Sequence, residues 1–296
     1  MDLARLALDD RDGFERHVRD EVPAIVVGGA RAWPAVTRWT PAYLAERIGD
    51  AAVRWKLSAS NVHPNFRAAS LAEMFATEAG TFAELLAAIT TGEPAERARR
   101  LFTGDEKFLL RRRDGVTTID EALRPLLQDV ILPIPMDRLY TVWAWFSGPG
   151  VYTWLHYDNN ACHNLNAQLV GSKRCVLYAP DELARMAPFV LGGDNPAYNC
   201  SSLDVEREPL AGGLTGQLDT GDLLFIPAWW FHSFTHAGDF NANVNVWWKP
   251  ETPRWNAVAA RQALVDSVAA AKLDPKDPVT SGILRRLDAA AIARTA

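Results

Sequence analysis

The alternation of apolar and polar residues changes its period near residue 138. Before that point, residues 24–29 form an apolar run that predicts a buried strand, and other segments repeat their apolar positions at helical spacing. Thr40 followed by Pro41 is a typical helix start. Helices are predicted at residues 40–50, 70–80, 81–90 and 118–130. The pattern therefore predicts an N-terminal α/β region over residues 1–135.

From residue 138 onward, apolar residues follow a period of two, in short runs separated by Gly, Pro, Asp and Asn. This pattern is typical of an all-β sandwich or barrel. Strands are predicted at residues 138–148, 153–158, 163–170, 173–180, 222–228, 231–236 and 241–249. After Pro250, helical spacing returns over residues 254–273. We therefore expect a mainly β core of seven or eight strands over residues 136–250, followed by a helical tail over residues 251–296.

The composition is that of an ordinary globular protein and argues against several classes of function. The 296 residues carry a net charge of −5, which disfavours a nucleic-acid-binding protein that relies on a global positive field. Cys162, Cys175 and Cys200 form no Cys-x-x-Cys pair, as expected in a reducing compartment. The N-terminus is charged throughout, and no apolar run approaches the ~20 residues of a transmembrane helix. We expect a cytoplasmic protein without a nucleic-acid or membrane partner.

The segment TWLHYD, residues 153–158, places His156 and Asp158 two residues apart within a predicted strand. Side chains at positions i and i+2 of a strand project from the same face, so the imidazole and the carboxylate point into one space. A buried carboxylate is costly unless it is paired, hydrogen-bonded or bound to a metal. The pair alone fits a simple His–Asp hydrogen bond as well as a metal site.

A third candidate ligand, His232, follows the bend that Pro227 begins, 76 residues after His156 (232 − 156). Two histidines and one carboxylate on one side of a metal, with other positions open, are typical of non-haem Fe(II) oxygenases. Zinc more often takes three histidines or a Cys/His set. His163 and His236 are more readily explained as structural or rim residues than as ligands.

Amide side chains gather on one face of two predicted strands. The residues that share these faces are Asn164, Asn166 and Gln168 on one strand, and Asn243, Asn245 and Trp247 on the other. The opposite faces carry mainly aliphatic and aromatic residues. Strands of this kind line a polar cavity or face solvent, and the position of the second strand after His232 favours the cavity.

Lys173 begins an otherwise apolar strand just after the Gly171–Ser172 turn. An inward-pointing lysine at that position needs an anion, and one carboxylate of a small diacid would serve. Thr153 could add a hydroxyl group to such a site. It lies three residues before His156, which is the wrong parity for a regular strand, so this role requires a bend or bulge.

The motifs TWLHYD, NLNAQLVGSKRCVLYAP, GDLLFIPAWWFH and NVNVWWK, taken in this order, resemble the JmjC and cupin-like family of Fe(II)- and 2-oxoglutarate-dependent oxygenases. The resemblance is strongest over residues 138–250 and is nearest to the branch of the asparaginyl hydroxylase that modifies the hypoxia-inducible factor. It implies a double-stranded β-helix, or jelly-roll, core.

The resemblance also implies the ligands of the cofactors. His156, Asp158 and His232 would bind Fe(II), and Lys173 and Thr153 would hold the distal carboxylate of 2-oxoglutarate. O2 would be the second co-substrate. The segment after Asp158 is two residues longer than in that hydroxylase.

Other positions are implied to surround the co-substrate or the substrate. Asn164 and Asn245 would contact 2-oxoglutarate or its surroundings, and Trp247 would lie on the substrate side. Leu109 falls where relatives have a tyrosine that shares the distal carboxylate. Co-substrate binding would then lack one hydroxyl group, or Arg111 or another group would replace it. Arg111 is also expected on the substrate side.

The expected activity is hydroxylation of an unactivated C–H bond, with a peptide or protein side chain as the first substrate class. The alternatives are a free amino acid or natural-product scaffold, and a non-catalytic cupin-like binding protein. The arginine-rich residues 97–113 are typical of a solvated face, and reception of an acidic peptide is the alternative. The C-terminal helices are expected to support a homodimer, as they do in relatives.

Overall fold

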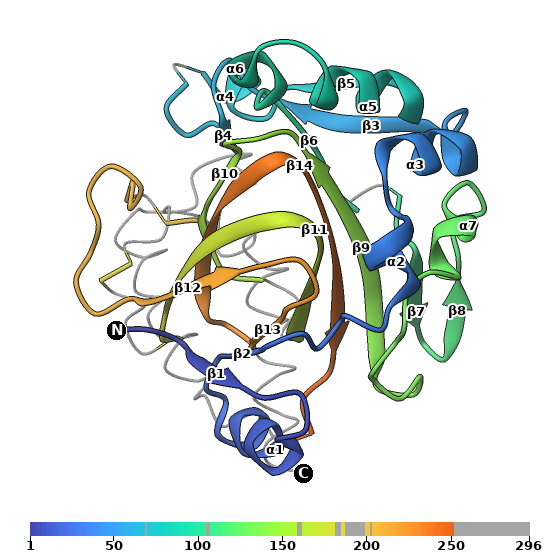
Figure 1. Cartoon of the computed structure of the whole chain (residues 1–296). Coiled ribbons are helices and arrows are strands. Elements are labelled where there is room, and N and C mark those ends of the chain that lie inside the picture. The colour runs from blue at the N-terminus through green and yellow to red at the C-terminus, as the bar shows by residue number, and fades with distance from the viewer. Residues whose placement is uncertain are drawn as a thin grey trace.

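The computed structural model describes residues 1–68, 70–104, 107–158, 162–180, 185–186, 199–201 and 203–251. Two long antiparallel strands run through its centre, β11 (His163–Tyr178) and β14 (Phe231–Trp248) (Figure 1). Each contains two segments that the sequence predicted as separate strands. The helical tail expected after residue 250, and the dimer expected through it, lie outside the described residues.

Both long strands bend where glycines relax the backbone. Gly171 in β11 has φ +74° and Gly238 in β14 has φ +89°, a region that residues with a Cβ atom rarely adopt. The pairing register shifts twice at this bend, between Gln168 and Ser172. A Cβ atom on Gly171 would lie 2.6 Å from the carbonyl oxygen of Phe240. The two halves of each strand therefore belong to two different faces of the fold.

The N-terminal half of β11 and the C-terminal half of β14 pair with each other in a large sheet. Next to β11 and β14 lie β13 (Leu223–Ile226) and β9 (Leu139–Ser147). Strands from the N-terminal region extend this sheet at both edges. They are β6 (Arg100–Phe102), β3 (Ala52–Leu57) and β5 (Thr77–Thr81) beyond β9, and β2 (Ala24–Val26) and β1 (Ala4–Leu6) beyond β13. β7 (Leu110–Arg113) and β8 (Val116–Thr118) form a hairpin paired to β9.

The other halves build a smaller face, on which β10 carries the first candidate ligand. Its strands are β12 (Leu214–Leu218), β11, β14, β10 (Tyr152–His156) and β4 (Val62–His63). Two sheet faces that share bent strands form a jelly-roll, so the predicted mainly β class with helical additions is confirmed (Figure 1). The division at residue 135 stays a prediction.

The described part of the chain contains seven short helices. They are α1 (Arg11–Asp20), α2 (Pro34–Arg38), α3 (Pro41–Ile48), α4 (Leu71–Met74), α5 (Phe82–Thr90), α6 (Pro94–Arg97) and α7 (Arg124–Leu127). The predicted start of α3 is confirmed, because the Thr40 side chain accepts a hydrogen bond from the Tyr43 backbone N–H. No described helix is both long and apolar enough to cross a membrane.

Two helix predictions are wrong in part. Residues 77–81 form a strand instead of continuing a helix, because they pair with β3, with Glu78 opposite Trp55. Pairing with a neighbouring strand overrides local propensity here. Within residues 118–130 only α7 is an α-helix, and Thr118 ends β8.

The main hydrophobic core lies between the helices and the outer face of the large sheet. Phe146 of β9 packs against Trp39 and Phe82, with ring centroids 5.6 and 5.0 Å apart. Val244 and Val246 of β14 belong to the same buried cluster. Because strand side chains alternate, the opposite face of these strands points away from the helices and into the jelly-roll, where the amides lie.

Candidate metal centre

The three candidate ligands converge at one end of the jelly-roll. Nε2 of His156 lies 4.0 Å from Oδ1 of Asp158, and Nε2 of His232 lies 3.9 Å from the same oxygen. One ligand atom from each residue falls within 4.8 Å of the other two. Among the described residues, this is the group of His, Cys, Asp and Glu side chains with the geometry of a metal site. Neither His163 nor His236 belongs to it.

Backbone carbonyls fix both histidine rings in the same way. Nδ1 of His156 is 2.7 Å from the carbonyl oxygen of Trp154, and Nδ1 of His232 is 2.9 Å from that of Trp230. A carbonyl oxygen only accepts, so each Nδ1 carries the proton. Each Nε2 is thereby the ring nitrogen that faces Asp158 and is left to bind a metal.

Irregular backbone places these ligands. β10 ends at His156, and the pairing of β10 with β14 shifts register between Thr153 and His156. The bulge that the parity of Thr153 requires is therefore present. Asp158 lies beyond the strand, so its proximity to His156 is not the simple i, i+2 strand geometry expected from the sequence. Trp229, with φ +71°, turns the chain just before His232.

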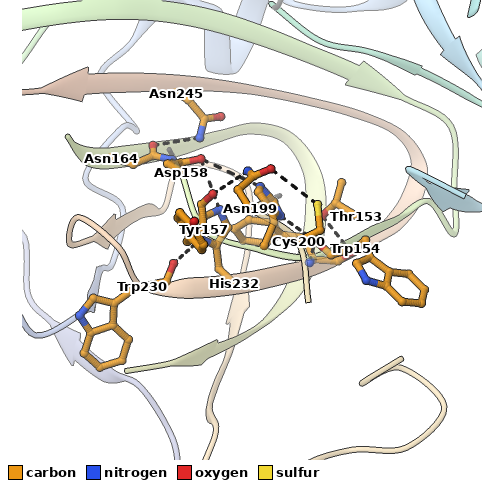
Figure 2. Close-up of polar contacts among 12 residues, drawn as sticks. Thr153, Trp154, Tyr157, Asp158, Asn164, Asn199, Cys200, Trp230, His232 and Asn245 are labelled. Carbon is orange, nitrogen blue, oxygen red and sulfur yellow. Dashed lines mark hydrogen bonds and ion pairs between the residues drawn. The ribbon is translucent and has the colours of Figure 1, made fainter. Parts of the chain in front are cut away.

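The second carboxylate oxygen of Asp158 is held by two donors. Nε1 of Trp247 donates to Oδ2 at 2.7 Å, and Nδ2 of Asn164 donates to the same atom at 2.9 Å. Oδ1 is thereby left to face the two histidines. Figure 2 shows Asp158 between Asn164 and His232. The two oxygens of this carboxylate have different tasks, because one is fixed by the protein and the other is directed at the metal position.

The amides form a directed chain that ends on Asp158. Asn166 and Asn243 each donate to Oδ1 of Asn245, at 3.2 and 2.7 Å. Asn245 donates to Oδ1 of Asn164 at 2.9 Å, and Asn164 donates to Asp158 (Figure 2). Asn164 thus contacts the ligand carboxylate, and Asn245 contacts only other amides among its described hydrogen bonds. Their expected contact with 2-oxoglutarate or its surroundings stays a prediction.

A cavity of about 310 Å³ opens beside the ligands. Part of its lining is the amide face of β11 and β14, and another part includes Leu57 of β3 and Phe75 after α4. Two buried polar atoms in the lining have no hydrogen-bond partner, Oδ1 of Asn166 and Nε1 of Trp145. Unpaired buried atoms of this kind are costly in an empty cavity, so they favour a cavity built for a polar ligand.

Lys173 lies in the lining of the same cavity and is buried. Its Nζ sits 4.5 Å from the ring centroid of Phe234, and it forms no ion pair within the described chain. Burial lowers the pKa of Lys173 to about 7. Thr153 lies on β10, directly opposite Phe234 of β14. An anion would supply the partner that this ammonium group lacks.

Neither Leu109 nor Arg111 lies in the lining of the cavity. Leu109 is fully buried in the main core, and its backbone N–H donates to the carbonyl of Val142. Arg111 is not among the lining residues, and its guanidinium group stacks 4.2 Å from the ring centroid of Phe108. The described contact of Arg111 is thus with Phe108, and its role toward the substrate or the co-substrate stays a prediction.

Sequence reasoning missed lining residues from several strands. His236 follows His232 by four residues on one strand, so even parity could have placed it on the ligand face. Trp145 lies opposite Asn243 and could have been found in the same way. His63 belongs to the two-residue strand β4, which leaves no periodic signal. His163 is structural, as expected, since its Nδ1 accepts from the backbone N–H of Ala228.

The donor set fits a divalent metal. Two neutral imidazoles and one carboxylate supply a −1 charge and three ligand atoms on one side, and the cavity leaves the other side open. Hydrogen bonds to the far side of all three ligands complete the support that metal sites require.

Comparison with known proteins is consistent with this arrangement. The chain is 29% identical to tRNA wybutosine-synthesizing protein 5 of Danio rerio over 250 residues, which cover 81% of this chain and 73% of that protein. It is 28% identical to the Homo sapiens protein of the same name, covering 84% and 78%. Lysine-specific demethylase 8 of Xenopus tropicalis is 25% identical, covering 78% of this chain and 50% of that protein.

These comparisons do not show the asparaginyl hydroxylase branch that the motifs suggested. The family described as "Cupin-like domain" matches residues 11–253, which include all three candidate ligands and both faces of the jelly-roll. The chain therefore belongs to the cupin-like, JmjC-type domain family.

Proposed function

We propose that this chain is an Fe(II)- and 2-oxoglutarate-dependent oxygenase that hydroxylates an unactivated C–H bond. One observation carries the proposal. A two-histidine, one-carboxylate triad faces a cavity in which a buried lysine, Lys173, has no acidic partner within the described chain. Iron favours that ligand set with open positions, and Lys173 would hold the far carboxylate of a 2-oxo diacid.

The chain's own residues would bind and orient the reactants. His156, Asp158 and His232 would hold the metal through Nε2, Oδ1 and Nε2. Lys173 would pair with the distal carboxylate of the co-substrate. When bound, iron and 2-oxoglutarate would supply the oxidation of the C–H bond by O2, with release of succinate and carbon dioxide.

The substrate that we propose is a side chain of a peptide or protein. Leu57, Phe75 and Trp145 give the cavity an apolar part of its lining, and 310 Å³ suits a single side chain or small molecule beside a co-substrate. The net charge of −5 disfavours a polyanionic substrate. One relative is named as a lysine-specific demethylase.

A nucleoside within tRNA is the second candidate substrate. It is favoured by the names of the two wybutosine-synthesizing relatives, which match this chain over more than four fifths of its length. A small-molecule substrate and a non-catalytic binding role are the remaining outcomes that the experiments below separate.

Anaerobic titration of the metal-free protein with Fe(II) and then 2-oxoglutarate tests the proposal. A saturable visible charge-transfer band is expected in the wild type and not in His232→Ala. Metal binding without any band would contradict the proposed co-substrate and favour the binding-protein alternative. Succinate release is then measured with peptide, tRNA and amino-acid pools as separate substrates. Stimulation by the peptide pool supports the proposed class, and stimulation by another pool alone replaces it.

A further inference from the structure

His236 occupies an unusual position in the cavity. It lies on β14 directly opposite Lys173 of β11, and directly paired residues of antiparallel strands share a face. Both side chains line the cavity and both are buried, with exposed fractions of 4% and 1%. His232, Phe234 and His236 follow one another at even spacing along the strand. The metal ligand and His236 therefore mark the two ends of one row of side chains.

One nitrogen of the His236 ring is fixed and the other is free. Nδ1 lies 2.6 Å from Oγ of Ser147, whose hydroxyl group can donate to it. No described residue forms a hydrogen bond with Nε2. With the serine as donor, Nε2 carries the proton and is a donor without an acceptor. A buried donor in that state costs free energy until a ligand pairs with it.

The surroundings of His236 are basic. The groups that lower the pKa of His236 well below its ordinary value are, in order, its burial, Lys173 and His63. The imidazole is therefore neutral in the ligand-free protein. Asp158 is the one carboxylate among the residues that line the cavity, and it faces the two metal-ligand histidines. This end of the cavity offers hydrogen-bond donors and no acid.

Thr153 is less available to an anion than its position suggests. Its Oγ1 accepts a hydrogen bond from the backbone N–H of Phe234 at 3.1 Å and donates to the carbonyl of the same residue at 3.4 Å. The hydroxyl group is thus already hydrogen-bonded to the backbone at the bulge in β10. Leu109, where a second hydroxyl was expected, is in the main core. A carboxylate held by Lys173 would therefore need another donor beside that lysine, and His236 is the cross-strand neighbour of Lys173.

We infer that His236 is a co-substrate-binding residue whose Nε2–H donates a hydrogen bond to the distal carboxylate of 2-oxoglutarate, next to the Lys173 ammonium group. The inference rests on the proposed function. It assigns to a histidine the contact that hydroxyl groups were expected to make, and it makes the Ser147–His236 pair part of co-substrate selection.

The test compares two ligands that differ only at the far end. 2-Oxobutyrate carries the same 2-oxo acid group as 2-oxoglutarate but lacks the distal carboxylate. Calorimetry with the Mn(II)-loaded protein gives the dissociation constant of each ligand for the wild type, His236→Phe and His236→Gln. Phe keeps a buried ring without a donor, and Gln keeps a donor.

In His236→Phe, the dissociation constant for 2-oxoglutarate is expected to rise roughly tenfold, the effect of losing one hydrogen bond to a charged group. The constant for 2-oxobutyrate is expected to stay unchanged. His236→Gln is expected to recover part of the loss, and also serves if the Phe variant does not fold. His163→Phe, a buried histidine outside the cavity lining, is the matched control and should affect neither ligand.

Three results would overturn the inference. Equal 2-oxoglutarate affinity in the wild type and both His236 variants would show that the ring makes no contact. Equal weakening of both ligands would show a structural role. Failure of the wild-type protein to bind either ligand, with Mn(II) in place, would contradict the proposed function itself, and is thereby distinguished from the first two results.

Discussion

The indole N–H of Trp247 donates a 2.7 Å hydrogen bond to Oδ2 of Asp158, the carboxylate that completes the candidate metal site. The motif had placed Trp247 on the substrate side. Trp247 lines the cavity, so its role on the substrate side stays a prediction. Its indole N–H also holds the back of a ligand, where it fixes which oxygen faces the histidines. Such outer contacts commonly change metal affinity by 10- to 100-fold when they are removed.

Trp247→Phe is therefore expected to weaken metal binding by about tenfold or more, because the ring remains but the donor is lost. Titration of the metal-free protein with Mn(II) measures the change. Trp143→Phe is the matched control, since the Trp143 ring packs 4.8 Å from Trp247 while its own Nε1 has no hydrogen-bond partner. An unchanged Mn(II) affinity in Trp247→Phe would refute the positioning role.

Asn245 is the junction of the amide chain, and its loss should be costly. Asn245→Leu leaves two amide N–H groups and the Oδ1 of Asn164 without their partner in a buried face. The free energy of unfolding is expected to fall by about 2–4 kcal/mol. Asn243→Leu removes only one donor at the end of the chain and should cost about 1 kcal/mol. Urea unfolding of the metal-free proteins compares the two variants. Equal losses of unfolding free energy would contradict the chain of amide hydrogen bonds.

The buried Lys173 should destabilise the ligand-free protein in a defined pH window. Burial holds its pKa at about 7 in the folded state, while the unfolded chain keeps the ordinary value near 10.5. Between these values the unfolded state binds more protons, so the free energy of unfolding rises with pH from about 7 upward. Below pH 7 both states are protonated and the full cost remains.

Lys173→Met is accordingly expected to raise the free energy of unfolding at pH 7 by about 1–3 kcal/mol and to flatten its rise at higher pH. The same variant should lose 2-oxoglutarate binding. Thermal or urea unfolding at pH 7 and pH 9 measures the difference. A variant less stable than the wild type at pH 7 would mean that Lys173 already has a stabilising partner.

The bend in β11 depends on a residue without a side chain. In Gly171→Ala, the new Cβ would lie 2.6 Å from both Oδ1 of Asn241 and the carbonyl of Phe240, in addition to the strain of positive φ. Gly92→Ala shares the positive φ but meets nothing within 4 Å. The first variant should therefore lose about 2 kcal/mol more unfolding free energy than the second. Similar losses in both would show that the close approach is tolerated.

Much of the β core could be predicted from the sequence, because a period of two survives in each strand. The sequence did not predict that β11 and β14 are each one continuous strand. Gly171 was interpreted as a turn between two strands, yet β11 runs through it, paired to β14 on both sides of the bend. Whether a glycine turns a chain or bends a strand depends on a partner distant in sequence, which local pattern does not contain.

The ligand set could also be predicted, since residue chemistry and spacing suffice to nominate His156, Asp158 and His232. The parity of Thr153 even required the bulge that the register shift reveals. The contacts between polar groups could not be predicted. A face can be assigned to Trp247 from alternation, but only the packed sheet determines that its indole reaches Asp158.

The course of β14 has a consequence for how the molecule can come apart. One strand carries His232, His236, Asn245 and Trp247, and it is paired on both sides for most of its length. Fraying at a loop cannot displace His232 while Asn245 and His236 keep their places, because all three belong to the same central strand. Backbone amides of β14 should then exchange with solvent only through global opening.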